Sequence, residues 1–259
     1  MDMTGRAAIV TGAAGSIGFA GAEALAAMGA DLLLVDIDAA GLDRAKAALA
    51  GHNTRIESIV ADCSRTAEVQ SYVAAAQDAF GRIDAFFNNA GVPGKLAPAH
   101  EYDEDEFDRI IAINLKSMFL GLRHVLPVMV AAGRGAVVNT GSIASERGLA
   151  GAIAYNTSKH GVIGLTRTAA SDVGALGVRV NAVMPGVIDT PLLENMLVKM
   201  FDGDIAAGKA ALGKNATLDR IATPSEVGDV VAFLLSDAAS FVNGAAWAVD
   251  GGALSTIKH

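Results

Sequence analysis

A tyrosine and a lysine, Tyr155 and Lys159, stand four positions apart in the chain. On a helix, two residues at this spacing share one face, with about 5 to 6 Å between their Cβ atoms. A neighbouring ammonium favours the phenolate form, so Lys159 is expected to lower the pKa of Tyr155. Tyr155 is then a candidate general base for oxidising an alcohol and a candidate general acid for reducing a ketone. Many helices carry such a pair by chance, so its position in the fold has to show whether the pair belongs to an active site.

The elements around this pair follow from the hydrophobic pattern. Seven short apolar runs alternate with longer segments of helical period, at residues 7–10, 32–35, 56–60, 85–87, 136–138, 178–183 and 246–249. Runs of this kind are typical of strands buried on both faces of a parallel sheet. Because the alternation continues to the C-terminus, the sequence predicts one α/β domain over residues 1–259, a doubly wound parallel sheet of about seven strands flanked by helices.

Polar residues follow the carboxyl ends of these strands, which is the edge where ligands bind in open α/β sheets. Ser142 lies just past the fifth run, where its hydroxyl could hydrogen-bond a substrate oxygen as charge develops on it. Asp62 and Cys63 end the third run, and the Asn-Asn-Ala-Gly tetrad at 88–91 ends the fourth. The tetrad also favours a tight turn, and a turn and a binding site are compatible with each other. Ser142 and Tyr155 at one edge make a candidate active site.

A glycine-rich turn, Thr-Gly-Ala-Ala-Gly-Ser-Ile-Gly at residues 11–18, follows the first run directly. Glycine lets the backbone approach a pyrophosphate, and the helix N-terminus offers free N–H groups to it, although such turns also occur for steric reasons. Asp36 ends the second run, where a carboxylate either caps a turn or accepts hydrogen bonds from an adenosine ribose and repels a 2′-phosphate. Gly15 and Ile37 occupy the places where an arginine or lysine would hold that phosphate, so the sequence predicts NAD over NADP.

With these motifs in order, the chain resembles the short-chain dehydrogenase/reductase family over nearly its whole length. The glycine-rich turn, the tetrad 88–91, the Tyr155–Lys159 pair and the interval from Ser142 to Tyr155 all match the family's pattern. The resemblance implies a Rossmann-type fold and an oxidoreductase that transfers a hydride between NAD and a secondary alcohol or ketone. It also implies that Asn114 is a fourth catalytic residue, anchoring a water chain that leads through Lys159 to solvent. On its own, Asn114 would be a helix kink or a buried polar residue.

The resemblance further implies which residues hold the dinucleotide, including a segment at 185–190 that binds the nicotinamide amide. The predicted cofactor-binding residues are Gly12, Gly15, Ser16, Ile17, Gly18, Asp36, Asp62, Cys63, Asn89, Ala90, Gly91, Tyr155, Lys159, Pro185, Gly186, Ile188 and Thr190. Two positions depart from the family's pattern. Ser16 replaces the usual middle glycine of the turn, with Gly15 one position earlier. His160 follows Lys159 where a small residue is common, as a proton carrier or a surface histidine.

The residues expected around the substrate are mostly apolar: Ser142, Ala144, Ala152, Tyr155, Val187 and Met196. Arg147 is the only basic residue in the short segments near Ser142, so a neutral secondary alcohol is expected, with a cyclic alcohol as one candidate. Segment 189–215 begins with an amphipathic stretch and then becomes rich in glycine and lysine, which predicts a mobile excursion from the sheet. Its apolar stripe forms either a substrate lid or a surface helix packed on its own domain.

Composition argues against several other classes of protein. The 259 residues carry a net charge of −8 without a block of lysine and arginine, which disfavours a nucleic-acid or anionic-membrane partner and favours a small molecule. The sequence has no long uninterrupted apolar stretch, no export signal and a single cysteine, so a cytoplasmic protein is expected. No cluster of histidines and carboxylates suggests a metal. The resemblance implies a homotetramer.

Two other functions stay open at this point. Many family members of this length are NADPH-linked 3-oxoacyl thioester reductases, against which Asp36 and the lack of a basic residue in the turn both count. A catalytically silent nucleotide-binding scaffold is the second alternative, since a fold does not fix a function. Such a scaffold is expected to have lost Ser142, Tyr155 or Lys159, and all three are present.

Overall fold

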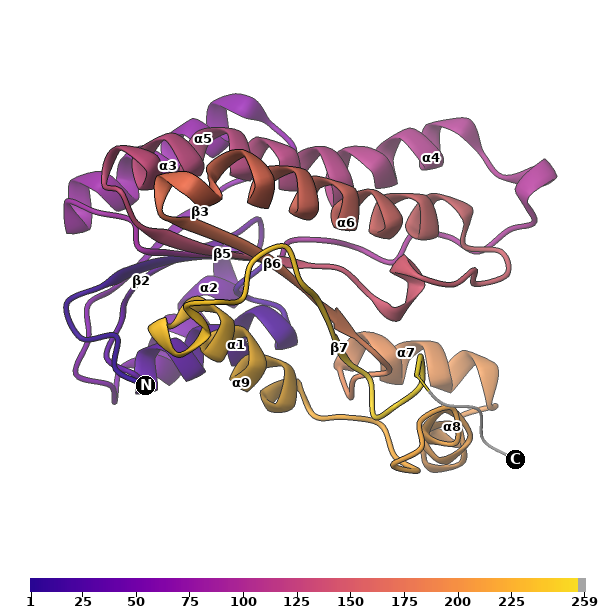
Figure 1. Ribbon diagram of the computed structural model, residues 1–259. Coiled ribbons are helices and arrows are strands. Elements are labelled where there is room, and N and C mark those ends of the chain that lie inside the picture. Colours follow the sequence, from indigo (N-terminus) through magenta and orange to yellow (C-terminus); the bar gives the residue numbers. More distant parts are fainter. Residues whose placement is uncertain (256–259) are drawn as a thin grey trace.

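The computed structural model describes residues 1–255, with residue 199 described by its backbone only. Its parallel sheet has the strand order β3-β2-β1-β4-β5-β6-β7, so the chain winds outward from β1 in one direction and from β4 in the other (Figure 1). The strands are β1 (Ala7–Thr11), β2 (Asp31–Asp36), β3 (Ile56–Val60), β4 (Ala85–Asn88), β5 (Gly135–Thr140), β6 (Val178–Pro185) and β7 (Ala246–Val249). Every predicted apolar run is a strand, and the predicted fold class is confirmed.

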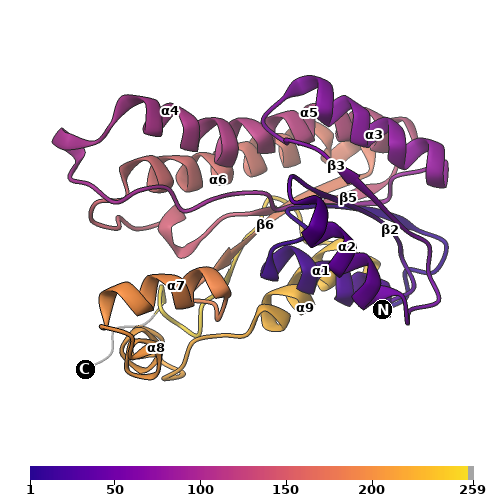
Figure 2. The ribbon, with the colours of Figure 1, turned by 180° about the vertical axis from the view of Figure 1, so that it is seen from behind.

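Helices cover both faces of the sheet (Figures 1 and 2). One face carries α1 (Ser16–Ala27), α2 (Ala39–Leu49) and α9 (Pro224–Leu235), and the other carries α3 (Thr66–Phe80), α5 (Ser117–Ala131) and α6 (Ile153–Val173). Helix α4 (Glu104–Ile111) runs into α5 through a π-helical turn at Ala112–Lys116. Successive residues of β1 enter opposite cores, Ile9 on the α3 face and Val10 on the α1 face, which is why the strand is apolar throughout.

The two edge strands are less buried than the sequence predicts. Residues of β3 and β7 are mostly half-exposed, and the side chain of Val60 at the end of β3 is 54% exposed. An edge strand has a neighbour on one side only, so its covering helix leaves part of it open to solvent. An apolar run in sequence therefore does not distinguish a central strand from an edge strand.

Segment 189–215 forms two helices, α7 (Pro191–Met200) and α8 (Ile205–Gly213), to one side of the sheet (Figure 2). A Cβ on Gly208 would lie 2.7 Å from Cδ2 of Leu197, so this glycine serves close packing of α8 on α7. The ammonium of Lys209 lies 2.8 Å from carboxylate oxygens of both Asp189 and Glu194. Gly208 and Lys209, whose residue types predict a mobile excursion, thus join the two helices. Movement of α7 and α8 stays a prediction. None of the helices within residues 1–255 is long and apolar enough to cross a membrane.

Candidate active site

A cavity of about 1760 Å³ follows the carboxyl ends of the strands, from Asp36 at the end of β2 to Tyr155 on α6. It passes the switch point between β1 and β4, where the strand order reverses and ligands bind in such sheets. All the residues predicted to touch cofactor or substrate, including Ser142 and Lys159, line this cavity. The structure therefore brings the predicted residues together, while their roles toward ligands stay predictions.

The glycine-rich turn has the shape of a pyrophosphate cradle. Gly12 has a φ of +65°, and a Cβ on Gly18 would lie 2.0 Å from the carbonyl oxygen of Gly12, so both positions require glycine. Gly15 is the N-cap of α1, and among the described residues no side chain caps this helix. Gly15, Ser16 and Ile17 line the cavity, so the uncapped helix end and its positive dipole are available to an anion there.

Asp36 caps the turn, one of its two predicted roles, and its role toward a ribose stays a prediction. One carboxylate oxygen accepts a hydrogen bond from the backbone N–H of Ala14 at 3.0 Å, and the other accepts from the N–H of Asp38 at 3.1 Å. The carboxylate therefore shapes the turn, and each oxygen keeps a lone pair for a ribose hydroxyl. The neighbouring Ile37 side chain is 71% exposed and offers no charge to a 2′-phosphate.

Asn89 and Cys63 have limited means of binding a cofactor. The Asn89 side chain donates from Nδ2 to the carbonyl of Thr11 at 3.1 Å and accepts from Oγ1 of Thr140 at 3.0 Å, so it ties the ends of β1, β4 and β5 together. The backbone N–H of Asn89 is also taken, since it donates to Oγ1 of Thr11 at 2.8 Å. Burial raises the pKa of the Cys63 thiol to about 12, with the Asp36 carboxylate contributing next, so this residue is a neutral wall group.

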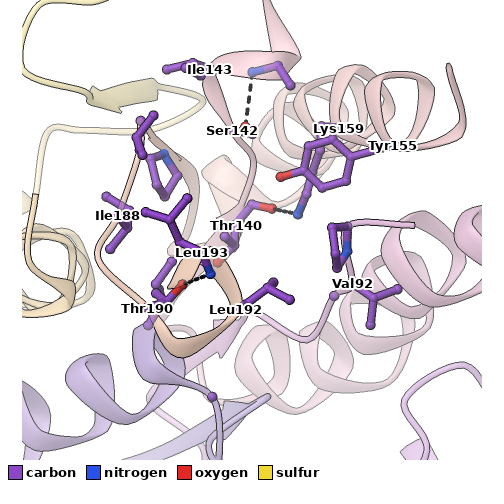
Figure 3. A pocket seen from close by; sticks show the side chains of 18 of the residues that line it. Val92, Thr140, Ser142, Ile143, Tyr155, Lys159, Ile188, Thr190, Leu192 and Leu193 are labelled. Atoms are coloured by element: carbon purple, nitrogen blue, oxygen red, sulfur yellow. Dashed lines mark hydrogen bonds between the residues drawn. The ribbon is translucent and has the colours of Figure 1, made fainter. Parts of the chain in front are cut away.

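The side chains predicted to be catalytic, Ser142, Tyr155 and Lys159, meet at the other end of the cavity (Figure 3). Ser142 follows β5 and caps the short 3₁₀ turn at Ile143–Ser145, its Oγ accepting from the N–H of Ala144 at 3.1 Å. The Tyr155 hydroxyl points into the cavity on the side of Ser142. The ammonium of Lys159 donates to the carbonyl of Thr140 at 2.8 Å and lies 5.7 Å from the centre of the Tyr155 ring.

In this geometry burial outweighs the predicted effect of Lys159 on the pKa of Tyr155. Burial raises the pKa of Tyr155, and hydrogen bonding to Ser142 only partly opposes that rise. Burial also lowers the pKa of Lys159, to about 8. Helical spacing fixes the separation of the Cβ atoms but not the end of a long side chain, and the ammonium is directed to Thr140 instead of the phenol oxygen.

Asn114 is fully buried in the π-helical turn and reaches the cavity wall through Val92. Its side chain accepts from the N–H of Val92 at 2.8 Å and donates to the carbonyl of the same residue at 2.8 Å. Its Nδ2 also donates to Oγ of Ser158, which donates in turn to the carbonyl of Tyr155. The interpretation of Asn114 as a buried polar residue is therefore confirmed, while a helix kink at its π-helical turn stays a prediction. The water chain stays a prediction.

Two positioning residues escape the sequence analysis. Oγ of Ser145 donates to the carbonyl of Lys159 at 2.8 Å and accepts from the N–H of Ser142 at 3.1 Å, so it fixes the serine loop to α6. The signal was present, since Ser142 and Ser145 have capping-box spacing. Asn156 donates to the carbonyl of Arg147 at 2.7 Å. His160 is exposed, with its ring nitrogen 2.9 Å from the carbonyl of Asn156, as expected of a surface histidine.

Comparison with known proteins agrees with this geometry. A family model described as enoyl-(acyl carrier protein) reductase matches residues 12–254. Levodione reductase from Leifsonia aquatica is 42% identical over 252 residues, which are 96% of this chain and 94% of the relative. Cis-4-hydroxycyclohexanecarboxylate dehydrogenase from Sinomonas cyclohexanicum is 42% identical over 247 residues, 95% of this chain and 96% of the relative. The crystal structure of NAD⁺-bound xylitol dehydrogenase matches with a TM-score of 0.92 at 33% identity, covering 97% of this chain and all of the other, 100%.

The chain belongs to the short-chain dehydrogenase/reductase family. Membership in the short-chain dehydrogenase/reductase family makes it an enzyme that uses a nicotinamide cofactor, and its named relatives are dehydrogenases and a reductase. The predicted family and reaction class, an alcohol dehydrogenase or ketone reductase, are confirmed. A catalytically silent scaffold is thereby the weaker alternative.

Proposed function

We propose that this enzyme transfers a hydride between NAD and a neutral, cyclic secondary alcohol or its ketone. One observation carries the proposal: a single cavity has Asp36 at one end, Tyr155 with Ser142 at the other, and an uncapped helix N-terminus between them. Asp36 and the uncharged Ile37 support NAD over NADP, because a carboxylate without a neighbouring cation repels a 2′-phosphate. A cyclic substrate is supported by the ring in the name of the Sinomonas relative.

When bound, the nicotinamide supplies the hydride for reduction or accepts it in oxidation. Ser142 donates a hydrogen bond to the substrate oxygen and holds it beside the phenol. In reduction Tyr155 gives its proton to that oxygen, and in oxidation the phenolate removes the proton from the alcohol. The positive charge of Lys159 lies beside the phenol and offsets the negative charge of the phenolate. Asn114 anchors the predicted path for proton exchange. Since burial raises the pKa of Tyr155, reduction has its proton donor at neutral pH, and oxidation is expected to accelerate as pH rises.

The proposed substrate site is the apolar end of the cavity, where Ala144, Ala152 and Val187 line the wall. The α7 side chains Leu192, Met196 and Met200 are 52%, 38% and 61% exposed and line the same cavity. Because these partly exposed side chains line the cavity, we propose that segment 189–215 covers the substrate as a lid on a single domain. The residues of segment 185–190 are proposed to hold the nicotinamide.

Assembly and location complete the proposal. A homotetramer is supported by the family and by large apolar side chains left exposed near the C-terminus, Phe241 and Trp247. A cytoplasmic location is supported by Cys63, the only cysteine, which is free. Sedimentation of the purified protein tests the assembly, and a monomer contradicts it.

The test of function is a substrate and cofactor screen. The purified enzyme is expected to reduce cyclohexanone with NADH and to oxidise cyclohexanol with NAD, both followed by the absorbance of the reduced cofactor. A 3-oxoacyl thioester with NADPH is the comparison, because the matching family model is described as a reductase of acyl carrier substrates. Turnover confined to the thioester and NADPH would overturn the proposal. Preference for an acidic over a neutral ring alcohol of like size would overturn neutrality alone.

A further inference from the structure

Three arginines within residues 1–255 line the cavity, and two of them are neutralised. Arg109 makes two hydrogen bonds to the Glu106 carboxylate, at 2.8 and 2.9 Å. Arg220 makes two to another carboxylate, Glu226, at 2.8 and 2.7 Å. The third, Arg147, has no carboxylate partner in the described part of the chain, and its guanidinium donates only to the carbonyl of Ala253, at 3.3 Å. A guanidinium has five N–H donors, so Arg147 keeps most of its own for a ligand.

The backbone of Arg147 is fixed relative to the proton-transferring phenol. Asn156, the residue after Tyr155, donates from Nδ2 to the carbonyls of Arg147 at 2.7 Å and Ala144 at 3.2 Å. Its Oδ1 accepts from the N–H of Leu149 at 3.2 Å. The side-chain amide of Asn156 thus holds both ends of the loop that carries Arg147. These bonds fix the backbone of the loop beside Tyr155, and the Arg147 side chain extends from that loop to line the cavity.

Arg147 is exposed, so the strength of a hydrogen bond to a substrate depends on how far the bound ring excludes water. Leu149 on the same loop and Met196 on α7 line the same cavity and offer apolar surface to such a ring. A ring that fills this space displaces water from around the guanidinium. Charge-assisted hydrogen bonds gain strength when water is excluded, and a guanidinium binds carbonyl and carboxylate oxygens well.

We propose that Arg147 is a specificity-determining residue that binds a second oxygen of the substrate, on a ring carbon away from the one that reacts. The shared chemistry is a hydrogen-bond acceptor, either a neutral carbonyl or a carboxylate. Arg147 takes no part in hydride or proton transfer, which stays with Tyr155 and Ser142. The inference rests on the proposed hydride transfer at a ring carbon and not on the neutrality of the ring, and it refines the substrate from a simple ring alcohol to one that carries a second oxygen.

Steady-state reduction of three ketones with NADH tests the proposal: cyclohexanone, 1,4-cyclohexanedione and 4-oxocyclohexanecarboxylate. The proteins are the wild type, Arg147→Met, which keeps length without charge, Arg147→Lys, which keeps charge without the planar fork, and Arg167→Met. Arg167 is an exposed arginine on α6 and serves as the matched control. The quantity compared is the ratio of kcat/KM for each second-oxygen ketone to that for cyclohexanone. Melting temperatures show whether each variant is folded.

In Arg147→Met this ratio is expected to fall between about tenfold and a hundredfold for at least one of the two second-oxygen ketones, mainly through KM. A fall for the dione identifies a neutral carbonyl as the ligand, and a fall confined to the acid identifies a carboxylate. Arg147→Lys is expected to retain part of the preference, and Arg167→Met all of it. Ratios unchanged in Arg147→Met for both ketones would overturn the role of Arg147.

Failure of the proposed function gives a different result. If the wild type reduces none of the three ketones, the assignment of a ring substrate fails, whatever Arg147 does. Binding is therefore measured beside turnover, as the rise in melting temperature that each ketone causes in the presence of NAD. A larger rise with a second-oxygen ketone than with cyclohexanone, lost in Arg147→Met, supports the arginine's role without turnover. Equal rises in wild type and variant contradict it.

Discussion

Lys159 is a buried charge, and replacing it with methionine is expected to remove a cost to stability together with catalysis. Lys159 is only 4% exposed, and burial lowers its pKa from 10.5 to about 8. At about 1.4 kcal/mol per pKa unit, keeping the ammonium in this site costs roughly 3 kcal/mol at neutral pH. Between pH 8 and 10.5 the folded protein binds fewer protons than the unfolded chain, so stability rises with pH in this window. The cost is full below pH 8 and absent above 10.5.

Lys159→Met keeps an unbranched side chain but also loses the hydrogen bond to Thr140, which costs about 1 to 3 kcal/mol at any pH. The change in unfolding free energy caused by the substitution at one pH is therefore less informative than the way this change varies with pH. The difference in unfolding free energy between variant and wild type is expected to shift by about 2 kcal/mol against the variant between pH 7 and pH 9.5. Denaturant unfolding at several pH values measures it. Lys214→Met, which replaces an exposed lysine, should show no trend. A flat difference for Lys159→Met would refute the buried ammonium.

Two further predictions concern the cofactor and the serine loop. The double variant Asp36→Ser with Ile37→Arg replaces the repelling carboxylate with a phosphate-binding guanidinium, so the NAD to NADP affinity ratio is expected to fall by about a hundredfold or more; calorimetric titration of each cofactor measures it, and an unchanged ratio contradicts the role of Asp36. Ser145→Ala frees the N–H of Ser142 and is expected to lower kcat about tenfold with NAD affinity retained. An equal loss of NAD affinity would show a merely structural role for Ser145.

The fold follows from the sequence because its signals are local and repeated. Every strand of the sheet contains a predicted apolar run, since strands buried by helices on both faces have to be apolar. The half-exposed edge strands β3 and β7 could not be distinguished, because strand order depends on contacts between distant segments. In segment 189–215, Gly208 and Lys209 have the composition of a flexible loop, yet their partners on and before α7 hold them in a helix.

The site was predictable as a set of residues but not as an electrostatic arrangement. Strand ends and spacing place Tyr155, Lys159 and Ser142 on one cavity, as the structure has them. The direction of the Tyr155 pKa depends on burial and on where the ammonium of Lys159 ends, which only three-dimensional packing fixes. In the same way, the Asn89 side chain is consumed by strand ends that lie far apart in the sequence.

The most direct test of the proposed mechanism is Tyr155→Phe, which removes one hydroxyl from the centre of the site. Removing the acid–base group is expected to lower kcat for reduction of a ring ketone by about 10² to 10⁴. NAD affinity should stay within about tenfold of the wild type, because at most one neutral hydrogen bond to the cofactor is lost. Single-turnover formation of the oxidised cofactor, with NAD affinity measured on the same preparation, gives both numbers. Turnover near the wild-type rate with intact NAD binding would contradict the assignment of Tyr155 as the proton-transfer group.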